Sequence, residues 1–205
     1  MEEKIARIKE WLGTGSINIF GLPMSGKDTQ GIRLAEMLGA KFLSSGMIIR
    51  AAEAETHRDL TGNGKLVPTN LFYDLVLPYF GRSDLADFPL ILSSIGRWYG
   101  EETSVIEMAS ATDHPIKAAV LLNISEADVM DRFETAKILN DRGDRNDDKE
   151  ASIFYTRIQE FTEKTLPVLQ HYKELGLLTE VRGDQTRDEV FLAMIDALYQ
   201  KTFEA

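Results

Sequence analysis

The segment GLPMSGK, residues 21–27, constrains this chain more than any other part of its sequence. It lies between a short apolar run, 16–20, and a segment 27–38 whose apolar residues recur at helical spacing. It matches G-x-x-x-x-G-K in the context that gives this pattern meaning, after a strand and at the start of a helix. Glycines let backbone N–H groups converge on an anion, and Lys27 adds a positive charge beside the helix N-terminus. We therefore expect a phosphate-binding loop.

The loop departs from the general pattern directly after its lysine. Where a serine or threonine is usual, this chain has Asp28, and Thr29 follows it. The competing interpretation is an ordinary strand-to-helix turn with an incidental lysine. We prefer a phosphate-binding loop because the strand, the loop, the lysine and the helix occur together.

The rest of the chain alternates apolar runs with segments of helical spacing. Further strands are expected at 41–45, 89–94, 118–125 and 177–183, and further helices at 101–111, 126–139, 150–174 and 186–202. The apolar runs lack polar alternation, which is typical of parallel strands that are buried on both faces. This pattern predicts an α/β fold in which helices cover a parallel sheet.

Composition excludes several classes of protein. The formal net charge of −10 argues against a nucleic-acid-binding surface and against an anionic membrane surface. The absence of cysteine excludes disulfides and thiolate metal sites, and no apolar run approaches the roughly 18 residues that span a bilayer. We expect a cytoplasmic monomer with no nucleic-acid or membrane partner. His57, His114 and His171 lack metal-ligand spacing, and we interpret them as surface or helix-end residues.

The stretch GLPMSGKDTQ resembles the phosphate-binding loop of adenylate kinases and related nucleoside-monophosphate kinases. That family also places a glycine or another residue directly after the lysine, and then a threonine. Further segments resemble the family in the same order along the chain: LSSGMIIR (43–50), GKLVPTNL (64–71), LILSSIGR (90–97), MDRF (130–133), RNDD (145–148) and TRIQEFTEKTLPVL (156–169). The resemblance covers essentially residues 16–202.

The resemblance implies a P-loop three-layer fold with a five-stranded parallel sheet covered by helices. One nucleoside-monophosphate kinase domain would extend over 16–205, after an N-terminal helical extension at 1–15. Within that domain, 46–80 would be the acceptor-binding insert and 136–147 a short lid.

The resemblance also implies which residues meet each substrate. The ATP-binding residues would be Met24, Ser25, Gly26, Lys27, Asp28, Thr29 and Arg132, and the acceptor-binding residues would be Ser45, Arg50, Lys65, Val67, Arg97 and Glu101. The catalytic residues would be Lys27, Arg97, Arg132, Arg145 and Arg157. Phosphoryl transfer brings two polyanions together, so it needs positioning and charge compensation, and arginine binds phosphate oxygens bidentately. No residue is expected to ligate a metal directly, because Mg²⁺ arrives with ATP.

Two positions depart from the family. Ser93 stands where the family has an aspartate that orders water around magnesium, so we expect weaker magnesium binding. Glu101 stands where the family usually has a glutamine that recognises adenine. An ionised carboxylate only accepts hydrogen bonds, so it would pair better with guanine. The alternative is that Glu101 begins the next helix, points to solvent and touches no base.

The implied reaction is transfer of the terminal phosphate of MgATP to a nucleoside monophosphate, with AMP preferred (ATP + AMP = 2 ADP). One alternative keeps the kinase but changes the acceptor to GMP, UMP or CMP. Another is a nucleotide-binding protein with little catalytic activity. Ser93 favours that last alternative, whereas Lys27 and the arginines argue against it.

Overall fold

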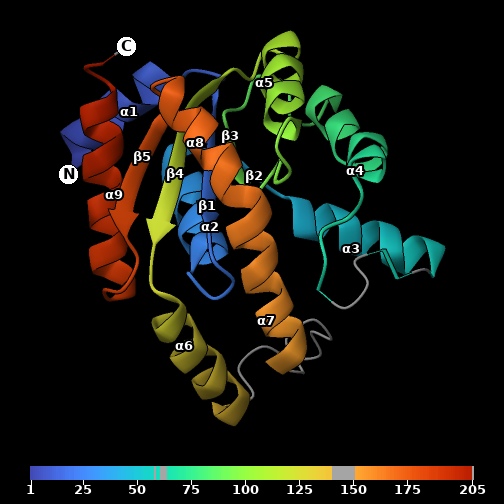
Figure 1. The fold of residues 1–205 in the computed structure, drawn as a ribbon. Helices are drawn as coiled ribbons and strands as arrows, with labels where there is room; N and C mark the ends of the chain where they lie inside the picture. Colours follow the sequence, from blue (N-terminus) through green and yellow to red (C-terminus); the bar gives the residue numbers. More distant parts are fainter. Residues whose placement is uncertain (58, 61–63, 140–150, 205) are drawn as a thin grey trace.

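The computed structural model describes residues 1–57, 59–60, 64–139 and 151–204. Its strands are β1 (Ser16–Gly21), β2 (Lys41–Ser44), β3 (Leu90–Ser93), β4 (Ile116–Asn123) and β5 (Leu178–Arg182). They form one five-stranded sheet in the order β2-β3-β1-β4-β5, and every neighbouring pair is parallel (Figure 1). The predicted α/β fold with a five-stranded parallel sheet is confirmed.

Helices connect all the strands. They are α1 (Glu2–Leu12), α2 (Lys27–Leu38), α3 (Ser45–Thr56), α4 (Thr69–Leu75), a 3₁₀ turn η1 (Leu77–Gly81), α5 (Glu101–Ala111), α6 (Glu126–Leu139), α7 (Ala151–Glu160), α8 (Leu166–Glu174) and α9 (Arg187–Lys201). A π-helical turn, η3 (Phe161–Thr165), joins α7 to α8, so the single helix expected over 150–174 is interrupted. Pro167 follows this turn, and proline cannot donate to the carbonyl four residues earlier, which favours such an adjustment.

One face of the sheet is covered by α1, α2 and α9. Ile17 and Ile19 of β1 point into this layer and join Ile8 and Leu12 of α1 in one buried cluster. The N-terminal helix therefore completes the core, and it lies beside α9 in Figure 1. An ion pair of 2.6 Å between Lys4 and Asp196 adds a contact between these two helices.

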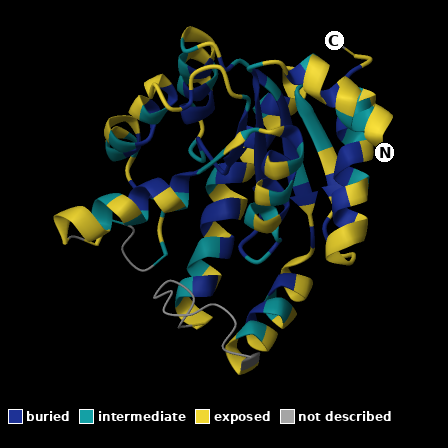
Figure 2. Ribbon diagram, turned by 180° about the vertical axis from the view of Figure 1, so that it is seen from behind, coloured by how far each residue is buried: buried dark blue, intermediate teal, exposed yellow. Residues whose placement is uncertain are grey.

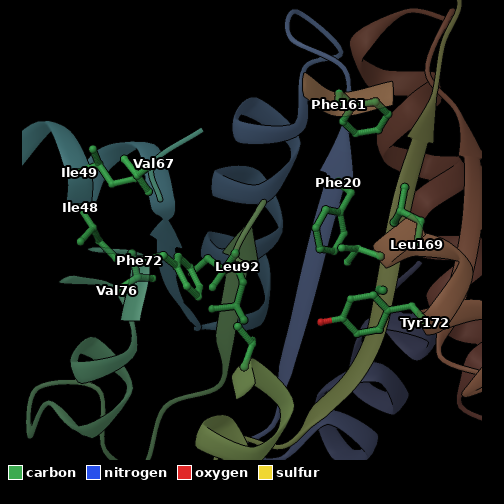
Figure 3. Close-up of a cluster of buried hydrophobic side chains, with 14 of the residues drawn as sticks. Phe20, Ile48, Ile49, Val67, Phe72, Val76, Leu92, Phe161, Leu169 and Tyr172 are labelled. Atoms are coloured by element: carbon green, nitrogen blue, oxygen red, sulfur yellow. The ribbon is translucent and has the colours of Figure 1, made fainter. Parts of the chain in front are cut away.

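The opposite face is covered by the segments from α3 to α8. Phe20 of β1 points into this layer, where it packs with Tyr172, and Leu92 lies near Phe72 and Val76 (Figure 3). Because β1 has buried neighbours on both sides, all six of its residues are buried, including the polar Ser16 and Asn18. Figure 2 shows the same arrangement, with buried residues along the sheet and exposed residues on the outer helix surfaces.

The carboxyl ends of the strands place the candidate site. The chain leaves β1 toward β2 and β3 on one side, and it later returns to β4 on the other side. Such a switch point in a parallel sheet is where ligands bind in open α/β folds. Helices α6 and α7 extend past this edge (Figure 1). Of the predicted lid at 136–147, only 136–139 is described, and Arg145 lies outside the described residues.

No helix in the described part of the chain has both the length and the apolar character needed to cross a membrane.

Candidate active site

The loop between β1 and α2 has the geometry of an anion-binding turn. Gly26 precedes α2 with φ 88° and ψ 8°, a left-handed conformation that favours glycine. A β-carbon on Gly21 would lie 2.5 Å from Ser25 Oγ, so the loop closes tightly only because this residue is glycine. Lys27 is the first residue of α2. The loop therefore brings the positive end of a helix and a lysine to the carboxyl edge of the sheet.

Arg132 on α6 lies against the same loop. Its Nη2 donates to the Gly183 carbonyl at 2.7 Å, and its Nη1 approaches the carbonyls of Met24 and Ser25 at 3.3 and 3.4 Å. The guanidinium thus joins the loop to the segment after β5. The structure places this predicted ATP-binding residue at the loop, with its hydrogen bonds made to backbone carbonyls.

Asp28 lies beside the end of β3. Ser93 Oγ donates a hydrogen bond of 2.5 Å to Asp28 Oδ1, although the two residues are 65 positions apart in sequence. Ser93 is buried, Asp28 is half-buried, and Thr29 is exposed. A carboxylate therefore does occupy the end of β3, but it comes from α2.

Arg97 and Arg157 form a pair of positive charges near the carboxyl edge. Burial and the nearby Arg157 lower the pKa of Arg97 to about 10, while Glu160, Glu101 and Asp28 favour its charged form. Arg97 Nε is buried and has no hydrogen-bond partner among the described residues. The guanidinium still carries its charge at neutral pH. Both arginines are half-buried, and two neighbouring cations that repel each other are suited to an anion placed between them.

Ser45 and Arg50 belong to α3 and lie near the same edge. Ser45 Oγ donates to the Ser94 carbonyl at 2.8 Å, which joins the start of α3 to the end of β3. A β-carbon on Gly46 would lie 3.0 Å from Arg50 Nη1, so the arginine folds back along α3 toward its N-terminus. The structure thus brings these two predicted acceptor residues to the same end of α3.

Lys65 and Val67 lie in the segment before α4. Lys65 is exposed, whereas Val67 is buried in the core near Ile48 and Ile49 (Figure 3). Between them, the Leu66 N–H donates to Glu160 Oε2 at 3.0 Å. This bond ties the segment to α7, and only the backbone of Val67 remains to face a ligand.

Glu101 is the first residue of α5, as expected, but it does not point to solvent. Its side chain is buried, and Oε2 accepts hydrogen bonds from the N–H groups of Arg97 at 2.9 Å and Trp98 at 3.0 Å. Burial raises the pKa of Glu101, against the opposing effects of the Trp98 N–H, the nearby Thr69 hydroxyl and the Arg97 N–H. Oε1 is buried without a partner of standard hydrogen-bond geometry among the described residues.

Curated relatives of this chain are similar over most of its length. An adenylate kinase of Thermus thermophilus is 31% identical over 194 residues, which covers 91% of this chain and 99% of that protein. The chain belongs to the adenylate kinase family. Adenylate kinases of Parvibaculum lavamentivorans and Streptococcus thermophilus are 28% and 24% identical, each over 84% of this chain. No family model matches the chain. Membership in the adenylate kinase family makes this protein a phosphotransferase.

Sequence reasoning missed Asn18, which orients the segment that carries Arg97. Asn18 is fully buried in β1; its Nδ2 donates to the Ile95 carbonyl at 2.7 Å, and its Oδ1 accepts from the Ile95 N–H at 3.3 Å. The side chain therefore fixes the turn between β3 and α5. A lone amide inside the apolar run SINIF was the available signal, because a buried polar group needs partners.

Two histidines also have unexpected surroundings. His114 follows the end of α5, as one of the two expected settings has it, but it is not a surface residue: it is 2% exposed, and its Nδ1 lies 3.0 Å from the Thr14 carbonyl. His171 lies 2.9 Å from the buried carboxylate of Glu102, whose other oxygen accepts from the Gly100 N–H at 2.7 Å. Both carboxylates at the start of α5 therefore hold the turn before it. No group of three or more potential metal ligands occurs within the described ranges.

Proposed function

We propose that this protein transfers the terminal phosphate of ATP to AMP and so forms two molecules of ADP. One observation carries the proposal. The glycine-containing loop that ends at Lys27 and a separate pair of arginines, Arg97 and Arg157, lie at the same edge of the sheet. A reaction between two polyanions needs two such positive regions, one for each. The names of the relatives support adenine nucleotides as the substrates.

Different residues would bind the phosphates of the two nucleotides. The N–H groups at the start of α2, together with Lys27, would bind the donor phosphates. Arg97, Arg157 and Arg50 would hold the acceptor phosphate, one of whose oxygens attacks the terminal phosphorus as the bond to the ADP leaving group breaks. That oxygen is already anionic, so no protein base is required. The arginines and Lys27 compensate the charge of the transferring group, and Arg145 would join them from the lid.

The site also fits a magnesium ion that is carried by ATP. Asp28, Ser93 and Thr29 offer only oxygen atoms, which are the ligands that Mg²⁺ prefers, and Mg²⁺ keeps several of its waters when phosphates bind it. The ion would neutralise charge on the phosphates as it does for other phosphoryl transfers. Asp28 would orient its water, with the carboxylate held in place by the Ser93 hydroxyl.

Water must be excluded while the terminal phosphate is in transit. We propose that 136–147 acts as the short lid and 46–80 as the second moving segment, which closes over the acceptor. We further propose a cytoplasmic monomer, and the net charge of −10 argues against nucleic-acid partners and anionic membrane surfaces.

One observation favours a second acceptor, GMP. Oε2 of Glu101 accepts from two backbone N–H groups, and Oε1 has no partner of standard hydrogen-bond geometry among the described residues, although the Thr69 hydroxyl lies near the carboxylate. A carboxylate oxygen can accept from the N–H groups of guanine and from the amine of adenine, but it has no hydrogen to donate to the N1 atom of adenine. We therefore expect appreciable activity with GMP beside AMP.

A coupled assay with MgATP and each monophosphate in turn tests the proposal. AMP should give the highest kcat/KM, GMP a measurable one, and UMP and CMP the lowest values. Tight ATP binding without transfer to any of the four would instead support a nucleotide-binding protein with little activity. Transfer to UMP or CMP at a higher kcat/KM than to AMP would make the acceptor assignment wrong.

A further inference from the structure

Asp28 is an unusual residue for its place in the loop. It follows Lys27 directly in the first turn of α2, where the N–H groups and the helix dipole attract anions. A carboxylate there opposes the arriving phosphates of ATP, because it has the same sign of charge. Over a few ångströms, repulsion between two like charges is large enough to change a binding affinity by roughly tenfold or more.

Ser93 keeps this carboxylate in the site. Its hydroxyl donates to Asp28 Oδ1 at 2.5 Å, and Ser93 is 1% exposed at the end of β3, which lies between β2 and β1 in the sheet. The bond costs one lone pair of Oδ1 and leaves Oδ2 to other partners. Asp28 also favours the charged form of Arg97. Its charge therefore acts both on the donor loop, residues 21–27, and on an arginine that is proposed to hold the acceptor phosphate. A carboxylate turned toward bulk water would need no such bond.

A divalent cation turns the repulsion between the Asp28 carboxylate and the ATP phosphates into a net attraction. Carboxylate and phosphate oxygens are both preferred by a hard cation, and metal-bound water donates hydrogen bonds to either of them. We propose that Asp28, positioned by Ser93, makes ATP binding depend on a divalent metal: it repels metal-free ATP and accepts hydrogen bonds from metal-bound water when the metal–ATP complex binds. The inference rests on the proposed function, since it requires that ATP binds at this loop.

A merely structural role for Asp28 predicts something different. An acidic residue in the first turn of a helix stabilises that helix through its dipole. Its loss would then lower the stability of the fold and change the affinities for ATP and MgATP by the same factor. The ratio of the two affinities therefore separates the roles, and it is measured without turnover.

The test is titration calorimetry of the full-length protein with ATP, once with excess EDTA and once with excess Mg²⁺. Asp28→Asn removes the charge but keeps an oxygen that can accept from Ser93. We expect it to tighten metal-free ATP about tenfold and to weaken MgATP about tenfold. Ser93→Ala should change both affinities in the same directions by smaller factors. Glu36→Gln is the matched control, because Glu36 is exposed in the last turn of the same helix.

A double variant tests whether the place of the charge matters. The double variant Asp28→Asn with Ser93→Asp moves the carboxylate from α2 to the end of β3. This variant should restore most of the metal dependence that Asp28→Asn loses. Equal changes of both affinities in Asp28→Asn, or a double variant no different from Asp28→Asn, would overturn the inference and leave the proposed function intact. A wild-type protein that binds ATP under neither condition would instead contradict the proposed function.

Discussion

The donor loop and the acceptor side of the site are built in different ways. Beside the donor loop, residues 21–27, the charged side chains of Arg132 on α6 and Asp28 on α2 are bonded to other parts of the protein, and the shape of the loop depends on glycine backbone. In the loop, the buried atom without a partner is the neutral Ser25 hydroxyl oxygen, whereas on the acceptor side the buried Arg97 Nε and Glu101 Oε1 belong to charged side chains and lack partners of standard hydrogen-bond geometry among the described residues.

This difference separates a preorganised region from one that a ligand completes. A loop that is fixed by backbone geometry binds any triphosphate in much the same way, because its N–H groups contact phosphate and not the base. Buried charged atoms without partners are costly until something pairs with them. Substitutions in the donor loop should therefore affect catalysis with every acceptor, whereas substitutions on the acceptor side should change which acceptor is used.

The largest effect is expected from Lys27→Ala. A preorganised charge at the transferring phosphate contributes about 3 kcal/mol or more, so turnover should fall at least about 10²-fold. The fall should be similar for AMP and GMP, because Lys27 belongs to the donor loop. Turnover is measured with saturating MgATP, and circular dichroism checks the fold. Normal turnover in a folded variant would contradict the phosphate-binding role of the loop.

Arg97→Ala should come next in size and should affect one substrate only. A hydrogen bond to a charged group contributes about 1.5–3 kcal/mol, so kcat/KM for the acceptor should fall roughly tenfold to a hundredfold. The dissociation constant of MgATP should stay within about twofold of the wild-type value, since Arg97 lies outside the donor loop. Arg82→Ala, at an exposed ion pair with Asp84, serves as the control. Equal losses for donor and acceptor would break the division between the two regions.

Much of the fold could be predicted because its strands are continuous apolar runs between helices. A run such as PLILSS has few other ways to bury its side chains, and it became β3. Both ends of the helix at Glu101–Ala111 were also predicted, because a glycine and an acidic first turn mark its start. The π-helical turn before Pro167 was missed, since spacing alone does not show where a helix absorbs an extra residue.

The site could be predicted as residue types but not as contacts. The resemblance placed Ser93 and Asp28 on separate motifs, and only the sheet brings them together. Glu101 was expected at a helix start, but its direction depends on the turn before it, whose N–H groups bind Oε2. Sequence patterns report periodicity and local signals, whereas hydrogen-bond partners depend on the packing of distant segments.

Glu101→Gln should change the choice of acceptor by a smaller factor. The glutamine carbonyl would take over the two backbone N–H groups, so its amide nitrogen would occupy the place of Oε1. An amide donor suits the N1 atom of adenine, where the carboxylate suits guanine. The ratio of kcat/KM for AMP to that for GMP should rise about tenfold, which matches one neutral hydrogen bond of about 1 kcal/mol or slightly more. An unchanged ratio would mean that Glu101 does not contact the base.

The smallest expected effect is on stability, and it tests whether the acceptor side stores an unfavourable charge. Burial raises the pKa of Glu101 in the folded protein, so the folded state holds this proton more tightly than the unfolded chain does. The resulting stability is present at low pH and is lost as pH rises through the folded pKa. The free energy of unfolding is measured in urea for Glu101→Gln and wild type. The value for the variant should therefore rise relative to that of wild type as pH increases above about 4.3, the ordinary pKa of glutamate. At exposed Asp84, whose pKa is lowered by its hydrogen bond with Arg82, substitution with asparagine should give the opposite trend. If the free energy of unfolding of Glu101→Gln instead falls relative to wild type as pH rises, the buried carboxylate is stabilised in its charged form. The charged groups of the acceptor side would then be as well paired as those beside the donor loop.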